Sequence, residues 1–245
     1  MTAYIHCSLA SGGIWKPLIE ALQHPAPVLV ELPGHGQAPD WDQDMDYHDQ
    51  AVDLALSCLP SEPVDIVGHS FGATVALRLA LDWPERVQSL ILIEPVFFAA
   101  AREAGDPAYE AHRQAFQPFL EAIENGNQAA AAREFTEIWG GGAPWNSLPD
   151  AQKKYFADRI HLIPAGAPAI EEDRAGLLAD GRLEALAIPV TLIEGERSPA
   201  VIPAIHAELA RRLPRADRLT IKGAGHMLPV SHTRQLAARL RPLLA

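Results

Sequence analysis

The chain has 245 residues, enough for one α/β domain with a core of its own, and the composition of an ordinary soluble protein. Its formal net charge of −11 disfavours nucleic acid and anionic membranes as partners, and no apolar run is long enough to span a bilayer. Two cysteines are too few for a disulfide framework, and the first residues lack the pattern of a signal peptide. We therefore expect a cytoplasmic protein.

Short, apolar, β-branched runs alternate with helical segments along the chain. Such runs are typical of parallel strands that are covered on both faces. The predicted strands are Tyr4–His6, Pro27–Leu32, Pro63–Val67, Ser89–Ile93, Pro189–Ile193 and Asp217–Ile221. The predicted helices between and after them are Trp15–Gln23, Tyr47–Leu59, Ala73–Leu81, Pro203–Leu213 and Thr233–Leu244. This alternation predicts a doubly wound sheet with ligands at the carboxyl ends of its strands.

The alternation stops between about Phe98 and Leu186, where the sequence predicts only helices. The insertion follows the fourth predicted strand, and the third strand leads into a glycine-flanked serine. We therefore expect the insertion to form a helical lid over the strand ends, with a separate small domain beside the core as the alternative. The expected division is a core of residues 1–97 and 187–245 and a lid of residues 98–186.

The third predicted strand runs directly into Gly68-His69-Ser70-Phe71-Gly72, and a helix follows. Strand, G-x-S-x-G and helix are the context of a nucleophile elbow, in which the serine sits on a strained turn above the sheet. The flanking glycines let strand and helix come close together around that turn. Ser70 is therefore the predicted nucleophile.

A glycine-rich turn with a histidine, Gly223–Met227, follows the last predicted strand. From there, a neutral imidazole of His226 could accept the hydroxyl proton of Ser70 during attack and return it to the leaving group. The chain has ten histidines, and position alone singles out His226. We interpret His6 and His35, at strand ends, as structural.

Taken in order, His6-Cys7-Ser8, Pro33-Gly34-His35-Gly36, the G-x-S-x-G segment and Gly225-His226 resemble the α/β-hydrolase superfamily. Within it, Ile93-Glu94-Pro95-Val96-Phe97 and Gly225-His226-Met227-Leu228-Pro229 resemble the lid-bearing bacterial serine hydrolases. The resemblance implies that the backbone amides of Ser8 and Phe71 form an oxyanion hole. The family usually opens with an antiparallel hairpin. This chain begins at what would be the third strand, so the resemblance implies that the hairpin is reduced or absent.

The sequence does not decide which acid orients His226. Relatives usually carry an Asp after the strand that follows the lid, but here that loop reads Glu194-Gly195-Glu196-Arg197-Ser198-Pro199. Glu94, directly after the fourth strand, matches the place of a Glu in some haloalkane dehalogenases of the superfamily. Glu196 is the alternative, and a missing acid is the third reading.

Aromatic residues of the lid and apolar residues beside the predicted catalytic groups are candidates for a substrate pocket. The candidates are Leu9, Phe98, Trp139, Trp145 and Met227. The sequence shows neither a metal-ligand spacing nor a phosphate-binding glycine loop, so we expect no metal and no cofactor.

These observations predict a serine hydrolase that acts on a carboxylic ester or related acyl compound with an apolar group. Carbon–carbon bond hydrolysis, lactone opening, thioester hydrolysis and a lyase reaction remain alternatives, because this fold carries many reactions. A slow or non-catalytic ligand-binding sensor is the alternative of another class. The expected partner is a small-molecule substrate.

Overall fold

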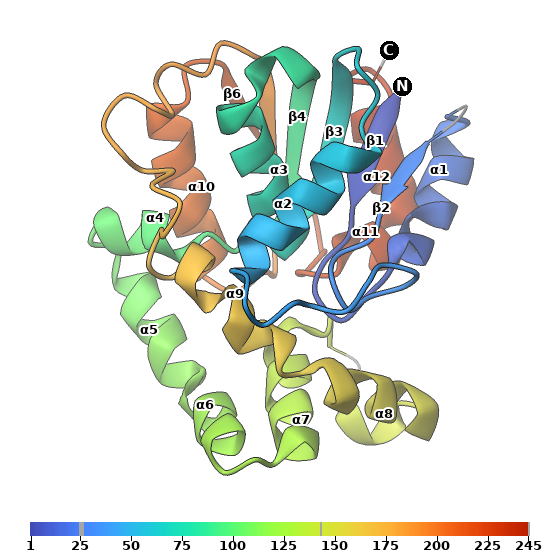
Figure 1. Cartoon of the computed structure of the whole chain (residues 1–245), viewed down its shortest axis with the longest axis vertical. Coiled ribbons are helices and arrows are strands. Elements are labelled where there is room, and N and C mark those ends of the chain that lie inside the picture. Colours follow the sequence, from blue (N-terminus) through green and yellow to red (C-terminus); the bar gives the residue numbers. More distant parts are fainter. Residues whose placement is uncertain (25–26, 143, 245) are drawn as a thin grey trace.

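The computed structural model describes residues 1–24, 27–142 and 144–244, and within them one sheet is formed by six parallel strands (Figure 1). The strands are β1 (Thr2–Ile5), β2 (Val28–Val30), β3 (Val64–His69), β4 (Val87–Ile93), β5 (Val190–Gly195) and β6 (Ala216–Ile221). Their order across the sheet is β2-β1-β3-β4-β5-β6. The prediction of a doubly wound parallel sheet is confirmed.

The strands are apolar on both faces because a hydrophobic core lies on each side of the sheet. Side chains alternate along a strand, so Ile66 of β3 joins one core and Val67 joins the other. In β1, Ile5 and Tyr4 divide in the same way. This double burial explains why the strands read as continuous apolar runs rather than as alternating patterns.

Helices cover the two faces of the sheet. The helices outside the insertion are α1 (Lys16–Leu22), α2 (Tyr47–Cys58), α3 (Phe71–Asp82), α10 (Val201–Arg212), α11 (Leu228–Ser231) and α12 (Thr233–Leu240), with 3₁₀ turns at Gly12–Trp15 and Pro84–Arg86. Helices α2 and α3 cross in front of the strands in Figure 1, and α1 packs against α12 on the other face. The last helix ends four residues earlier than the predicted Thr233–Leu244.

The chain reverses its direction across the sheet beside β1. Strand β2 lies on one side of β1, whereas β3 and all later strands lie on the other. The carboxyl ends of β1 and β3 therefore meet at a topological switch point, which is where doubly wound sheets bind ligands. The turn after β1 and the serine after β3 both lie at this point.

Helices fill the predicted insertion between β4 and β5. They are α4 (Phe98–Glu103), α5 (Pro107–Ala115), α6 (Gln117–Glu124), α7 (Gln128–Trp139), α8 (Asp150–Arg159) and α9 (Leu162–Ile170), with a 3₁₀ turn at Trp145–Ser147. In Figure 1, α5 to α8 lie below the sheet, at the strand ends opposite the N-terminus. Helix α4 packs on α10, and α9 packs on α2 and α3, so both ends of the insertion contact the core.

Residues Ala143 and Ala245, which fall within the predicted lid and core ranges, lie outside the described residues. Within the described part of the chain, all strand pairings are parallel, so this sheet contains no antiparallel hairpin. No helix among the described residues is both long and apolar enough to cross a bilayer.

Buried histidines are expected to make the fold sensitive to acid. Burial lowers the pKa of His35 and His112 to about 4 and that of His48 to about 3. Between these values and the ordinary pKa of about 6.5, the unfolded chain binds more protons than the folded one, so stability falls as pH falls. We expect each histidine to contribute about 1 kcal/mol of loss per pH unit below pH 6.5.

Urea unfolding at pH 7, 6 and 5 measures this effect in a range where carboxylates contribute little. His112→Phe should reduce the slope of stability against pH, because Phe keeps the aromatic packing and removes the proton site. His161→Phe, at an exposed position, is the control and should leave the slope unchanged. If stability depended equally on pH in the wild type and both variants, the acid sensitivity would not come from His112.

Candidate active site

Ser70 occupies a strained turn between β3 and α3. Its φ of 57° and ψ of −123° lie outside the regions that L-residues usually adopt. A Cβ on Gly68 would lie 2.5 Å from the carbonyl oxygen of Gly72, and a Cβ on Gly72 would collide with the carbonyl oxygen of His6. Both glycines are therefore required for the close approach of strand and helix, as the G-x-S-x-G pattern predicts.

His226 lies between Ser70 and Glu94. Its Nε2 is 3.1 Å from Ser70 Oγ, and its Nδ1 is 3.0 Å from Glu94 Oε2. A carboxylate accepts only, so Nδ1–H donates to Glu94 and Nε2 is left to accept from the serine hydroxyl. All three side chains are buried, and Glu94 is fully so. The arrangement is that of a nucleophile, a base and an orienting acid.

Hydrogen bonds from the loop after β5, where relatives usually carry an Asp, hold the Glu94 side chain in place. Its Oε1 accepts from the backbone N–H of Gly195 and from the hydroxyl of Ser198, both at 2.6 Å. Glu94 itself has φ 53°, so its backbone is held in the left-handed region at the end of β4. The alternative, Glu196, is exposed, and its carboxylate accepts from the backbone N–H of Gly223 instead. The structure thus brings Glu94, and not Glu196, to His226.

The predicted oxyanion donors lie beside the serine. Ser8 and Phe71 line the same cavity as Ser70. Phe71 is the first residue of α3, so its N–H belongs to the first turn, which has no carbonyl partner within the helix. Ser8 and Leu9 form a tight turn after β1, in which Leu9 has a φ of 59°.

Side chains of His35 and Tyr155 hold this turn. The N–H of Leu9 donates to Nε2 of His35 at 3.0 Å, and the hydroxyl of Tyr155 donates to the carbonyl oxygen of Ala10 at 3.1 Å. Burial keeps His35 neutral, and its Nδ1–H donates to Pro33, so Nε2 is an acceptor. The contacts of His35 agree with the interpretation of this residue as structural, and they show that it holds the turn of Ser8.

His69, the residue before the serine, contacts the loop of the histidine. Its Nε2–H donates to the carbonyl oxygen of His226 at 2.9 Å, and the two rings lie 5.1 Å apart. Complete burial lowers the pKa of His69 well below its usual range, so the ring is neutral. The sequence shows that His69 lies in the elbow, but it does not show that its hydrogen-bond partner is His226, 157 residues later.

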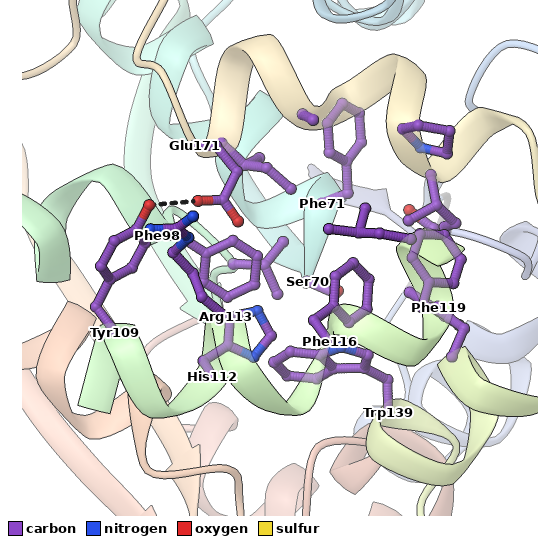
Figure 2. Close-up of a pocket in the computed structure, with 18 of the residues that line it drawn as sticks. Ser70, Phe71, Phe98, Tyr109, His112, Arg113, Phe116, Phe119, Trp139 and Glu171 are labelled. Atoms are coloured by element: carbon purple, nitrogen blue, oxygen red, sulfur yellow. Dashed lines mark hydrogen bonds between the residues drawn. The ribbon is translucent and has the colours of Figure 1, made fainter. Parts of the chain in front are cut away.

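A cavity of about 570 Å³ opens from Ser70 between the sheet and the insertion (Figure 2). Phe98 and Trp139 line it as predicted, and the Trp139 ring also packs edge-on against His226, with 4.6 Å between centroids. Aromatic and aliphatic side chains make up most of the wall, including Phe71, Phe116, Phe119, Phe135, Leu162 and Ile163.

The other predicted pocket residues do not line this cavity, which corrects the sequence interpretation. Leu9 packs with Phe119 in a separate small core beneath α6 to α8, and Trp145 packs against that same cluster. Met227 lies against Gly141. These three residues are close in sequence to a site residue or belong to the insertion, but their side chains pack against other residues.

The family model described as the alpha/beta hydrolase fold matches residues 4–233. The chain belongs to the α/β-hydrolase family. Lipase LipV of Mycobacterium tuberculosis is 28% identical, with 98% of this chain and 91% of the relative covered. A pimeloyl-(acyl-carrier protein) methyl ester esterase of Xanthomonas campestris pv. campestris is 30% identical over 98% of this chain and 93% of the relative.

Solved structures share this fold. A lipase-esterase related protein from Clostridium acetobutylicum has a TM-score of 0.72 at 16% identity, covering 98% of this chain and 93% of the other. Carboxylesterase CesB from Bacillus subtilis has a TM-score of 0.66 at 18% identity, covering 98% and 81%. The family, with the lipase and the methyl ester esterase among its members, shows that the chain is a hydrolase enzyme.

Proposed function

We propose that the chain is a serine hydrolase that cleaves a carboxylic ester with an apolar group next to the scissile bond. The observation that carries this proposal is the hydrogen-bonded series Ser70–His226–Glu94, which opens into a largely apolar cavity. The lipases and esterases among the relatives support ester chemistry.

In the proposed mechanism, Ser70 Oγ attacks the ester carbonyl while His226 Nε2 takes the hydroxyl proton. Glu94 stabilises the imidazolium that forms, and the amides of Ser8 and Phe71 bind the oxyanion. His226 then gives the proton to the leaving alcohol, which leaves an acyl group on Ser70. A water molecule, activated by the same imidazole, attacks the acyl-enzyme and releases the carboxylic acid.

A nearby thiol does not compete for the role of nucleophile. Cys7 is buried beside the turn of Ser8, and burial raises its pKa to about 12. At neutral pH it is a protonated thiol, which is a poor nucleophile. Ser70, in contrast, contacts a histidine that can accept its proton.

We propose a free small-molecule substrate rather than an acyl group on an anionic carrier. Residues 98–186, which supply most of the cavity wall, contain 14 acidic and 8 basic residues, a formal charge of −6. A negative surface slows the approach of a negatively charged partner and favours a neutral one.

Labelling with a fluorophosphonate, combined with a panel of p-nitrophenyl esters of graded acyl length, tests the proposed function. We expect covalent labelling at Ser70 and hydrolysis that favours medium over very short acyl groups, because the cavity is apolar next to the serine. The panel also contains a thioester, a lactone and a β-diketone, so that the alternative cleavage reactions are measured alongside. Labelling at another residue would overturn the proposal, and the absence of both labelling and turnover would favour the sensor.

His35 is expected to position the oxyanion turn. His35→Phe removes the acceptor of the Leu9 N–H, and a buried N–H without a partner costs about 1–3 kcal/mol. We expect kcat to fall by about 10-fold or more with little change in KM, because the oxyanion forms only in the transition state. Binding of a boronic acid that mimics the tetrahedral intermediate should weaken in parallel, whereas His161→Phe should alter neither. An unchanged kcat in His35→Phe would contradict the role.

A further inference from the structure

Helix α5 presents an unusually polar face to the cavity. Tyr109, His112, Arg113 and Phe116 follow the spacing i, i+3, i+4, i+7, and all four line the cavity. A helix that only packs against its neighbours buries apolar side chains on such a face. In Figure 2, Tyr109 and Glu171 lie towards one end of the cavity, and Phe71, Phe119 and Trp139 lie towards the other. The cavity therefore has a polar end and an aromatic end.

At the polar end, a hydrogen bond joins the two walls of the cavity. The hydroxyl of Tyr109 donates to Oε2 of Glu171 at 3.1 Å (Figure 2). Tyr109 comes from α5, and Glu171 directly follows α9. Glu171 is half-buried, and this burial raises the pKa of its carboxyl group. The Tyr109 oxygen and Oε1 of Glu171 keep acceptor capacity for a further group.

His112 adds a polar group to the aromatic wall between the two ends. Its side chain is only 7% exposed, and Nε2 has no hydrogen-bond partner among the described residues. The ring stacks on Phe98 with 4.4 Å between centroids and lies edge-on to Trp139 at 5.4 Å. Burial lowers its pKa to about 4, so the ring is neutral and offers one donor and one acceptor. Nε2 has almost no accessible surface in this structure, so a ligand pairs with it only when the His112 ring turns towards the cavity. A buried polar atom without a partner is costly, so that pairing gains affinity.

Side chains of both charges line the polar end of the cavity. Arginine and glutamate side chains both line the cavity there, namely Arg102, Arg113, Glu110, Glu171 and Glu172. Arg113 and Glu110 form an ion pair at 3.5 Å. A carboxylate on the ligand would meet three glutamates as well as two guanidinium groups, and an ammonium group the same groups with opposite signs, so attraction and repulsion largely offset each other and neither charge gains enough to replace its lost hydration. An uncharged group that donates a hydrogen bond meets neither penalty and finds the free acceptors of Tyr109 and Glu171.

We propose that Tyr109, His112 and Glu171 form a polar subsite that binds an uncharged hydroxyl or amide on the substrate, at the end remote from the scissile ester. The substrate is then an ester whose apolar segment lies along the aromatic wall and whose far end carries a neutral hydrogen-bonding group. This proposal rests on the proposed function, because it describes the substrate of the same serine.

Paired esters test the subsite. ω-Hydroxy p-nitrophenyl esters of three chain lengths are each compared with the methyl-terminated ester of the same atom count. At the length that spans the cavity, we expect kcat/KM to favour the hydroxyl by about tenfold, since the methyl-terminated ester leaves the polar groups of the subsite without a partner. Esters with a terminal carboxylate or ammonium group of equal length should be poorer substrates than the hydroxyl ester.

His112→Phe and the double variant Tyr109→Phe, Glu171→Gln should each lower the hydroxyl-to-methyl ratio to near one. His161→Phe, an exposed histidine on the loop between α8 and α9, is the matched control and should keep the ratio. Because a ratio is measured, a general loss of activity from altered packing does not imitate this result. A ratio near one in the wild type, an unchanged ratio in both variants, or a preference for a charged end would overturn the proposal.

Binding to Ser70→Ala separates this proposal from the proposed function. Calorimetry with the same ester pairs measures affinity without turnover. If the wild type hydrolyses no ester but Ser70→Ala binds the hydroxyl ester about tenfold more tightly, the proposed function fails and the subsite stands. Equal affinity for both esters, with normal turnover in the wild type, rejects the subsite alone.

Discussion

Ser70→Ala is expected to lower ester hydrolysis by about 10⁴-fold or more, because members of such a catalytic unit act together. The substitution removes the only atom that the mechanism uses to form the acyl-enzyme. It should leave the fold intact, since the hydroxyl does not cap α3 and its contact is with His226. Steady-state hydrolysis, fluorophosphonate labelling and thermal unfolding measure the three expectations.

Ser61→Ala, at an exposed position before β3, is the matched control and should retain wild-type rate and labelling. Residual activity of Ser70→Ala above about one hundredth of the wild type would assign the nucleophile to another residue, since a triad serine contributes far more than this. A large fall in melting temperature would instead show that the strained turn depends on the serine side chain.

Local sequence was sufficient to predict the sheet and the strained turn that carries Ser70. The apolar runs of a parallel sheet and the glycines on either side of Ser70 are short-range patterns, and each has a steric or burial cause. The structure shows these causes directly: the strands face a core on both sides, and the two elbow glycines have no room for a Cβ. Such short-range patterns determine the local structure with little dependence on distant residues.

The partners of His226 and of the oxyanion turn depend on contacts between distant segments, which the sequence does not display. His226 is 132 residues from Glu94, and Leu9 is 26 residues from His35. The sequence left Glu94, Glu196 and a missing acid open, because all three were compatible with the strand order. The choice depends on the hydrogen bonds of Gly195 and Ser198, which fix Glu94 from the opposite loop.

The pocket was the least predictable part for a related reason. Met227 and Leu9 are each adjacent in sequence to a site residue, but neighbouring side chains leave the backbone in different directions. The spacing of Tyr109, His112 and Arg113 shows that they share a helix face, yet only the fold shows that this face meets a cavity instead of solvent.

Glu94→Gln is expected to lower kcat by about 10²–10⁴-fold with a much smaller change in KM, if the pair acts as an acid and histidine do in other triads. The amide keeps the shape of the side chain but removes the negative charge that stabilises the imidazolium. If the amide N–H₂ takes the place of Oε1, it opposes the N–H of Gly195, and two donors meet. If it takes the place of Oε2, it donates to Nδ1 of His226 and drives the histidine towards the wrong tautomer. Steady-state kinetics on the preferred ester measure the effect.

Glu196→Gln is the matched control, because it makes the same chemical change two residues from the loop contacts of Glu94. Its exposed carboxylate accepts from Gly223, so we expect activity within about twofold of wild type and a small effect on stability. Ser198→Ala provides an intermediate case: it removes one of two donors to Glu94 Oε1 and should lower kcat less than Glu94→Gln does. A large loss in Glu196→Gln with none in Glu94→Gln would transfer the role to Glu196. If neither variant lost activity, the charge of an acid would not be needed to hold His226, and a slow enzyme or a ligand-binding sensor would become the better account of the chain.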